Sequence, residues 1–224
     1  MSRSAVVFGA TGLVGRRVTE GLIAHSAWDR VVVIVRRPTG LVNPKLTEVI
    51  ADFNALGASA AAMQVDDVFA CLGTTIKVAG SKERFRQVDH DFTLAGATLA
   101  RGQGATRIAL VSSVGADAGS ANFYLRVKGE TERDVQAIGY GSVILARPSG
   151  LVGERSERRP GERIGVALAG ALSFAMVGGL RRYRPIGADA VARAMIAATL
   201  AGEPGARVLE HDALTALAQG LTSP

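Results

Sequence analysis

The chain has 224 residues, of which 48% are hydrophobic, and its formal net charge is +6. This length suits one α/β domain with a large core, or one domain with a small appendage. The single cysteine, Cys71, excludes an internal disulfide and a cysteine-based metal cluster, so no metal site is expected. It fits a reducing cytoplasm, the expected location, and the N-terminal apolar run is too short for a secretory signal. Aromatic residues make up 5% and no recognition motif is present, which argues against nucleic acid as a partner.

The N-terminal stretch Ala5–Gly15 leads from a strand pattern to a helix pattern through three glycines. This arrangement holds the pyrophosphate of a dinucleotide. Gly9 would permit the tight turn, Gly12 would let the backbone approach the phosphates, and Gly15 would let the helix pack on its strand. The N–H groups of the first helical turn would face the anion. The predicted phosphate-binding loop consists of Gly9, Thr11, Gly12, Leu13, Val14 and Gly15.

The β-branched run Arg30–Val35 predicts a central parallel strand that is buried on both faces. Arg36 follows it, 21 residues beyond Gly15, with Arg37 beside it. An NAD-selective site usually has an acid here, to bind the ribose 2′-hydroxyl. Because a guanidinium suits a 2′-phosphate, the pair favours NADP, with NADPH preferred over NADH; a solvated strand end is the alternative.

Two further strands are predicted, at Lys45–Ile50 and Asp67–Leu72. Asp52, after the first of them, would either accept a hydrogen bond from an adenine amino group or cap the next helix. The second strand ends in Gly73, Thr74 and Thr75, small residues that would let the cofactor ribose approach. Cys71, Leu72 and Gly73 are therefore expected to contact the cofactor. Cys71 is expected to be a core residue rather than a reactive thiol.

The rest of the chain continues the alternation of strands and helices, which predicts a doubly wound parallel sheet of the Rossmann type. One domain is expected over residues 1–224, with a small substrate-side helical region at about 155–202. In the helix predicted from Phe85 to Leu99, His90 lies off the apolar stripe and is expected to be exposed and solvated. The other predicted elements are Arg107–Val111, Phe123–Ile138, Ser142–Ala146, Ala188–Leu200 and a short strand at Val208–Leu209.

The uncharged segment Ile164–Leu180 lies at the short limit for a membrane span and is rich in Ala, Gly and Ser. A buried or interface helix is therefore expected, and no membrane span. Arginines gather on either side, in Glu154–Arg163 and Arg181–Arg184. Solvated loops are the favoured interpretation, and a site for an anionic cofactor or substrate is the alternative.

Tyr124 and Lys128 are four residues apart in a helical stretch and so share one face. Ser112 and Ser113 lie at the end of the preceding strand, which in this fold opens onto the cofactor crevice. A hydride moving between nicotinamide and a carbonyl must be matched by a proton, which a tyrosine can supply when a lysine ammonium stabilises its phenolate. A serine hydroxyl would hold the substrate oxygen.

Together these motifs resemble the short-chain dehydrogenase/reductase family, and the chain looks like its atypical, Tat-interacting oxidoreductase-like branch. The stretches that carry the resemblance are 9–15, 71–75, 85–91, 111–117, 123–130 and 146–153. The resemblance implies that Tyr124 is the proton donor, Lys128 its electrostatic partner and anchor of the nicotinamide ribose, and Ser113 the substrate-orienting hydroxyl, with Ser112 a close rival. Arg147 and Pro148 would lie beside the nicotinamide. Asp89 departs from the family pattern, in which many members have asparagine.

The leading hypothesis is an NADPH-dependent reductase of a small carbonyl compound. The alternatives are epimerase or dehydratase chemistry with a retained cofactor, and an NADP(H)-responsive binding protein with little turnover. The region after the sixth strand is small, so the substrate would be small, or the pocket open or completed by the second subunit of a homodimer.

Overall fold

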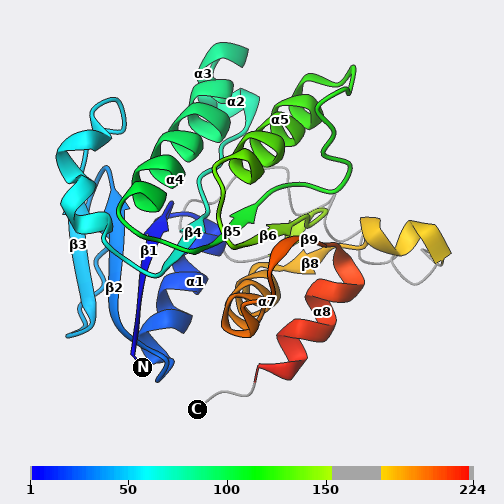
Figure 1. Ribbon diagram of the computed structural model, residues 1–224. Helices are drawn as coiled ribbons and strands as arrows, with labels where there is room; N and C mark the ends of the chain where they lie inside the picture. Colours follow the sequence, from blue (N-terminus) through cyan, green and yellow to red (C-terminus); the bar gives the residue numbers. More distant parts are fainter. Residues whose placement is uncertain (1, 153–177, 222–224) are drawn as a thin grey trace.

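The computed structural model describes residues 2–152 and 178–221 (Figure 1). The arginine-rich stretch Glu154–Arg163 and most of the uncharged segment Ile164–Leu180 lie outside the described residues. No helix in the described ranges is long and apolar enough to cross a membrane.

Seven parallel strands form one sheet in the order β3-β2-β1-β4-β5-β6-β9. This order confirms the predicted doubly wound fold, and it reverses direction between β1 and β4, where such sheets bind ligands. The strands are β1 (Arg3–Phe8), β2 (Trp28–Val35), β3 (Leu46–Ile50), β4 (Asp67–Ala70), β5 (Arg107–Val111), β6 (Ser142–Ala146) and β9 (Gly205–Leu209). Strand β9 is longer than the predicted Val208–Leu209, because its first residues pair with β6 although their side chains are small or exposed.

Helices cover both faces of the sheet (Figure 1). On one face lie α1 (Leu13–Ala24), α7 (Ala188–Ala201) and α8 (His211–Gly220), which share an apolar core with one side of the sheet. On the other lie α4 (Phe92–Gly102), α5 (Phe123–Ala137) and the 3-10 helix η1 (Leu56–Met63), over a second core. The smaller elements are α2 (Ile76–Ala79), the 3-10 helix η4 (Gly178–Tyr183) and the two-stranded pair β7 (Leu151–Val152) and β8 (Ile186–Gly187).

Helix α7 packs against α1 beneath the sheet, and this differs from its expected place in a substrate-side region. Small residues allow the close approach: a Cβ on Gly21 of α1 would lie only 2.6 Å from the Cδ1 atom of Ile196. Val191, Met195 and Ile196 are buried in the core that the two helices share.

The helix predicted from Phe85 to Leu99 is divided into three parts. A short helix, α3 (Lys82–Arg86), passes through a π-helical turn, η2 (Gln87–Asp91), into α4. A π-helical turn holds more residues than an α-helical turn, so it changes which side chains face the neighbouring helix. The prediction of an exposed His90 is therefore wrong: only 7% of the residue is exposed, and it lies against α5.

The amino ends of four adjacent strands are joined by one buried carboxylate. Oδ1 of Asp67 accepts hydrogen bonds from Arg3 (2.9 Å) and Arg107 (2.5 Å), and Oδ2 accepts one from Trp28 Nε1 (2.8 Å). Each of the four residues is the first residue of its strand. We call this group the amino-end cluster.

Candidate cofactor and proton-transfer site

The turn between β1 and α1 has the backbone that only glycine adopts without strain. Gly9 has φ +84°, and its carbonyl oxygen accepts a hydrogen bond from Gly12 N–H (2.9 Å). A Cβ on Gly9 would lie 2.4 Å from the Cys71 carbonyl oxygen. Substitution of Gly9 would therefore strain the turn and push it away from the end of β4.

Gly15 and Gly12 differ in the space around them. A Cβ on Gly15 would lie 2.1 Å from the Gly9 carbonyl oxygen, so this glycine lets α1 pack against the turn. Gly12 is exposed, and a Cβ there would lie 3.2 Å from the same oxygen. It is the N-cap of α1 and makes no side-chain cap, and the first turn holds no acid. The uncapped N–H groups of this helix fit an anion such as a pyrophosphate.

The residues that follow β4 lie between this turn and Lys128 of α5. Cys71 donates its backbone N–H to Phe8 of β1 (2.9 Å) and lies against Gly9. Two residues later, a Cβ on Gly73 would lie 3.6 Å from Asp89 Oδ1 and 3.9 Å from Lys128 Nζ. Residues 71–73 therefore lie between the glycine turn and the Lys128 ammonium. Burial raises the pKa of the Cys71 thiol to about 12, so this cysteine is not a reactive thiolate at neutral pH.

Helix α5 carries the two residues predicted for proton transfer. It begins after Asn122, whose side chain caps it by accepting a hydrogen bond from Leu125 N–H (3.2 Å). Tyr124 is partly exposed in its first turn, and its ring lies 5.6 Å from that of Phe85, centre to centre. Lys128 follows one turn later and is buried.

Lys128 forms an ion pair with Asp89. The distance from Nζ to Asp89 Oδ1 is 2.7 Å, and the exposed fractions of the two side chains are 8% and 0%. Burial opposes the charge on Lys128, but Asp89 and Tyr124 beside it outweigh this effect and raise the pKa of the ammonium. Lys128 therefore stays charged at neutral pH. We call Asp89 and Lys128 the carboxyl-end pair, because they lie beyond the end of β4.

Both candidate serines follow β5. Ser112 N–H donates to the Ala146 carbonyl of β6 (2.7 Å), and its buried Oγ has no hydrogen-bond partner among the described residues. Ser113 is partly exposed, and within residues 2–152 and 178–221 its Oγ makes a single long hydrogen bond, to the neighbouring Val114 carbonyl (3.4 Å). Either hydroxyl thus has bonding capacity for a substrate oxygen.

The residues predicted for the adenosine half of the cofactor lie at the strand ends on the opposite side of the glycine turn. Arg36 and Arg37 are exposed directly after β2. Asp52 is also exposed, and its Oδ1 accepts hydrogen bonds from the Asn54 backbone N–H (2.9 Å) and side-chain amide (2.8 Å). The Asn54 bonds lower the pKa of Asp52. The structure thus shows a local turn-closing role for this aspartate.

The Arg147 guanidinium is already paired with a carboxylate of α5. Its Nε donates to Glu132 Oε1 of α5 (2.8 Å), and a second nitrogen bonds the other carboxylate oxygen. This bidentate pairing with Glu132 raises the pKa of Arg147. Pro148, which follows, is buried, and its carbonyl accepts a hydrogen bond from Val114 N–H (3.0 Å). Glu132 was not singled out from the sequence, although it lies four residues after Lys128 and so shares its helix side.

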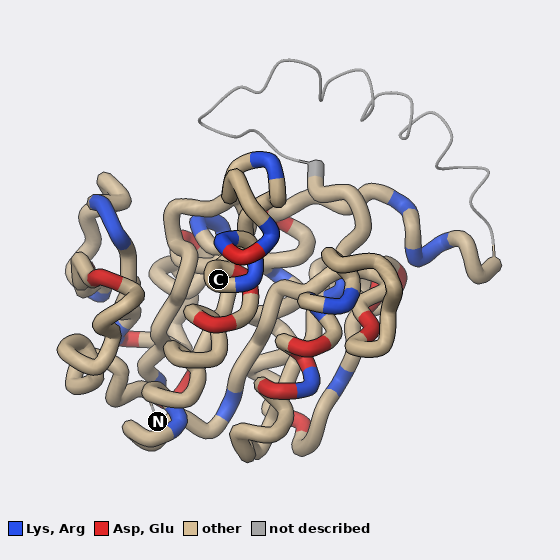
Figure 2. Tube along the Cα trace, turned by 90° about the horizontal axis from the view of Figure 1, so that it is seen from above, with Lys and Arg blue, Asp and Glu red and all other residues tan. Residues whose placement is uncertain are grey.

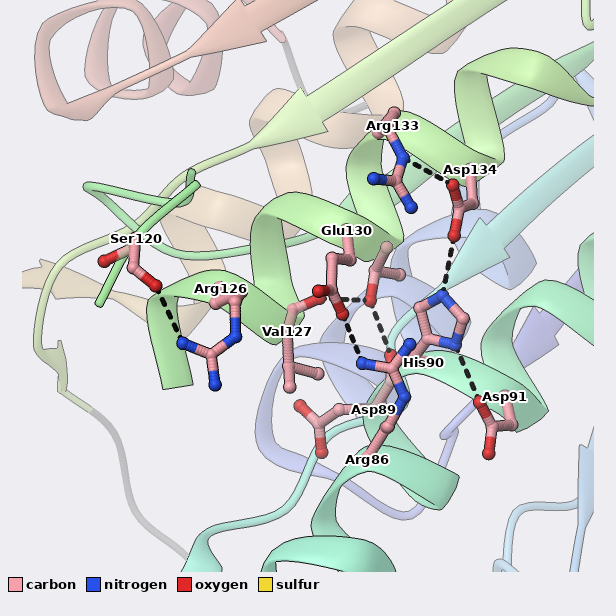
Figure 3. Close-up of polar contacts among 11 residues, drawn as sticks. Arg86, Asp89, His90, Asp91, Ser120, Arg126, Val127, Glu130, Arg133 and Asp134 are labelled. Carbon is pink, nitrogen blue, oxygen red and sulfur yellow. Dashed lines mark hydrogen bonds and ion pairs between the residues drawn. The ribbon is translucent and has the colours of Figure 1, made fainter. Parts of the chain in front are cut away.

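Further polar contacts hold the π-helical turn against α5 (Figure 3). His90 bonds to Asp91 Oδ1 through Nδ1 (2.7 Å) and to Asp134 Oδ2 through Nε2 (2.9 Å), and Arg86 pairs with Glu130. His90 thus has a structural role here. Seen from above, acidic and basic segments are interspersed over the described chain (Figure 2).

The comparisons agree with this geometry. A family model described as "NAD(P)H-binding" matches residues 9–163. Protein fmp52, mitochondrial, of Emericella nidulans is 36% identical over 176 residues, which cover 75% of this chain and 76% of that protein. Protein HTATIP2 of Rattus norvegicus is 35% identical over 175 residues, covering 76% and 72%.

Two solved structures show the same fold at low identity. MoeE5 in complex with UDP-glucose and NAD has a TM-score of 0.70 at 17% identity, covering 98% of this chain and 82% of that one. The UDP-glucose 4-epimerase of Thermotoga maritima has a TM-score of 0.69 at 17% identity, covering 97% and 82%.

Relatives named FMP52 contradict the predicted cytoplasmic location. The matched proteins of Emericella nidulans, Candida glabrata and Kluyveromyces lactis are all named mitochondrial. The prediction relied on the lone cysteine, which excludes an internal disulfide but does not distinguish one reducing compartment from another.

The glycine turn with its uncapped helix, the family model over residues 9–163 and the two relatives above 30% identity lead to one assignment. The chain belongs to the NAD(P)H-binding family, in the atypical short-chain dehydrogenase/reductase branch that includes HTATIP2 and FMP52.

Proposed function

We propose that this NAD(P)H-binding protein is an NADP(H)-dependent oxidoreductase that reduces a small carbonyl compound. The observation that carries the proposal is the position of residues 71–73. They touch the glycine turn at one end and approach Lys128 at the other, so a dinucleotide bound at the turn would extend toward Tyr124 and Lys128. The assignment of these residues to a cofactor site is part of the proposal.

Three regions would hold the cofactor. The Gly9–Gly15 turn and the first N–H groups of α1 would bind the pyrophosphate. Arg36 and Arg37 would bind the 2′-phosphate that distinguishes NADP from NAD. At the nicotinamide end, Lys128 would hydrogen-bond the ribose. Because the Arg147 guanidinium is engaged by Glu132, residues 147 and 148 would contact the nicotinamide through their backbone.

The side chains would then manage the proton and the substrate oxygen. When bound, the reduced nicotinamide supplies a hydride to the carbonyl carbon. The Tyr124 hydroxyl would donate its proton to the carbonyl oxygen, giving the alcohol and leaving a phenolate. Lys128 would stabilise that phenolate through its charge. Ser113, with Ser112 as the rival, would donate a hydrogen bond to the substrate oxygen and orient it.

The first experiment is a titration of the purified protein with NADPH and with NADH at matched salt, followed by nicotinamide fluorescence. We expect tighter binding of NADPH. Binding of neither nucleotide to the folded protein would remove the cofactor premise. The second experiment follows NADPH oxidation against a panel of aldehydes and ketones, with Tyr124→Phe as the inactive variant and the exposed Tyr183→Phe as the matched control.

The outcomes separate the proposed reductase from its alternatives. We expect Tyr124→Phe to lose turnover and keep its affinity for NADPH, whereas Tyr183→Phe keeps both. Full activity in Tyr124→Phe would refute the assigned proton donor. Product formation without net loss of NADPH would indicate an epimerase or dehydratase, and binding without turnover would favour a regulatory protein.

A further inference from the structure

The π-helical turn η2 directs two consecutive side chains toward the same helix. Asp89 contacts Lys128 and His90 contacts Asp134, and both partners belong to α5. Because a π-helical turn holds more residues than an α-helical turn, it changes which side chains face the neighbouring helix. The Thr131 hydroxyl of α5, which donates to the Val127 carbonyl (2.8 Å), also lies 3.4 Å from the Asp89 carbonyl oxygen.

The Asp89 carboxylate is fully buried and has few partners. Oδ2 accepts the Thr74 backbone N–H (2.9 Å), just beyond Gly73. Oδ1 lies 2.7 Å from Lys128 Nζ, outside the angles of a regular hydrogen bond. Asp89 thus fixes the ammonium between α5 and the exit of β4, at the place where a nicotinamide ribose would lie.

The charges around Lys128 leave Asp89 as its main counterion. The ionisable groups that act on the ammonium are Asp89 from η2, and Tyr124 and Glu132 from its own helix. Glu132 is already neutralised by its bidentate pairing with Arg147. Gly73 and Thr74, which lie against the pair, carry no charge. With Asp89 in place, the pair is neutral, and Tyr124 faces a lysine whose charge is already balanced.

We propose that Asp89 is a positioning residue that offsets part of the charge of Lys128 and so weakens the electrostatic stabilisation that this lysine gives to the Tyr124 phenolate. A free ammonium within about 4–6 Å lowers the pKa of an acid by about 1–3 units, and a paired ammonium lowers it less. Reduction needs a protonated Tyr124, whereas oxidation needs the phenolate as a base. The consequence for the pH range of turnover rests on the proposed function, but the titration of Tyr124 does not.

The test is an ultraviolet titration of Tyr124, because phenolate and phenol absorb differently. The chain has three tyrosines, so subtracting the Tyr124→Phe curve isolates this one from Tyr140 and Tyr183. We expect the Tyr124 midpoint in Asp89→Asn to fall by at least about 1 pH unit. An unchanged or higher midpoint would overturn the proposal. Asparagine still accepts the Thr74 N–H, so the turn is retained.

A matched control and a second variant make the result specific. Asp134→Asn removes the same charge from α5, roughly 15 Å along the helix from Tyr124 by the α-helical rise, and should leave the midpoint unchanged. A fall as large as in Asp89→Asn would show a general charge effect and overturn the proposal. The double variant Asp89→Asn, Lys128→Met replaces the neutral pair by two neutral side chains. Its Tyr124 midpoint should return to the native value; a midpoint more than about 1 unit higher would show that Lys128 is not neutralised in the native protein.

This experiment uses the protein without nucleotide or substrate. Loss of NADPH binding would therefore defeat the proposed function and leave the Tyr124 result intact. An unshifted midpoint in a protein that binds NADPH would defeat the inference alone.

Discussion

The two ends of the sheet each bury one aspartate, and the two carboxylates are bonded differently. At the amino ends of the strands, Asp67 receives three side-chain hydrogen bonds, two of them from arginines. Beyond the carboxyl ends, Asp89 receives one backbone hydrogen bond and one lysine. Neither side chain is exposed. The same chemical group therefore lies in a saturated site at one end and in an under-bonded site at the other.

This difference distinguishes the amino-end cluster, which stabilises the fold, from the carboxyl-end pair, which lies at the candidate site. Arg3 and Arg107 cannot lose their protons, and with Trp28 they fill both oxygens of Asp67, so this cluster only aligns strands. Lys128 can titrate, it adjoins Tyr124, and Asp89 Oδ1 has bonding capacity left. A buried polar group that is only partly satisfied is costly, which is accepted mainly where a site must bind or react.

The largest effect is expected from Asp67→Asn. It would leave two partly buried arginines facing a neutral amide, and we expect the free energy of unfolding to fall by about 3–5 kcal/mol. Urea denaturation at pH 7 measures this, and NADPH affinity below the transition should be unchanged. Asp29→Asn, an exposed change in β2, is the control and should alter the free energy of unfolding by less than about 0.5 kcal/mol. A loss of less than about 1 kcal/mol for Asp67→Asn would show that the cluster does not hold the strands.

Gly12→Val should have the opposite effect from Asp67→Asn: a large loss of NADPH affinity and little loss of stability. The side chain would occupy the exposed space at the N-terminus of α1 where a pyrophosphate would lie, so we expect NADPH affinity to fall at least about 100-fold, or 2.7 kcal/mol. The free energy of unfolding should change by about 1 kcal/mol or less. Gly102→Val, at a helix end with open space around it, is the control for added bulk. Unchanged binding by Gly12→Val would remove the loop from the proposed site.

The sheet was predictable because its central strands are continuous β-branched runs. Val31–Val35 is wholly buried, and its sequence alone indicates a strand covered on both faces. The glycine turn was predictable for the same local reason, since strand, glycines and helix are contiguous. Helix α8 and the extension of β9 were not predicted, because their sequences are short or polar and their pairing depends on β6 and α7.

The site was only partly predictable, because its decisive contacts join distant residues. The sequence marks Asp89 as a departure from the family's usual asparagine. Its pairing with Lys128, however, involves the π-helical turn, which apolar periodicity does not reveal. The same turn buries His90 against the expectation of an exposed side chain. The engagement of Arg147 by Glu132 likewise needs α5 to lie over β6. Tyr124 and Lys128 could be paired from sequence because four residues separate them on one helix.

A smaller and selective effect is expected at the end of β2. The double change Arg36→Ala, Arg37→Ala would remove two exposed cations without touching the core. Since a hydrogen bond to a charged group contributes about 1.5–3 kcal/mol, NADPH affinity should fall about 10- to 100-fold, while NADH affinity changes less than about 3-fold. Matched titrations at one ionic strength measure both. Equal losses for the two nucleotides would show that the arginines do not bind the 2′-phosphate. Arg16→Ala, Arg17→Ala, which removes two exposed cations paired with Glu20, is the charge control.

The smallest effect is expected from Asp134, in the more exposed part of the contact between η2 and α5. Hydrogen bonds from Arg133 and then His90 lower the pKa of Asp134 to about 2. Because this pKa is below the unfolded value of about 3.9, the contribution of Asp134 to stability is complete above about pH 5 and is lost as the pH falls through about 2. Its side chain is 27% exposed and its surroundings are solvated, so Asp134→Asn should lower the free energy of unfolding by less than about 1 kcal/mol at pH 7.

Urea denaturation of the native protein and of Asp134→Asn at several pH values measures this difference. It should shrink as the pH falls from about 5 through 2 and vanish only below that value. Asp91→Asn, which removes the more exposed partner of His90, is the control and should lose less stability at pH 7. A difference that is undiminished at pH 2 would mean that Asp134 acts through packing rather than charge. The contact between Asp134 and His90 would then differ from both buried aspartates, because Asp67 and Asp89 act through their charge.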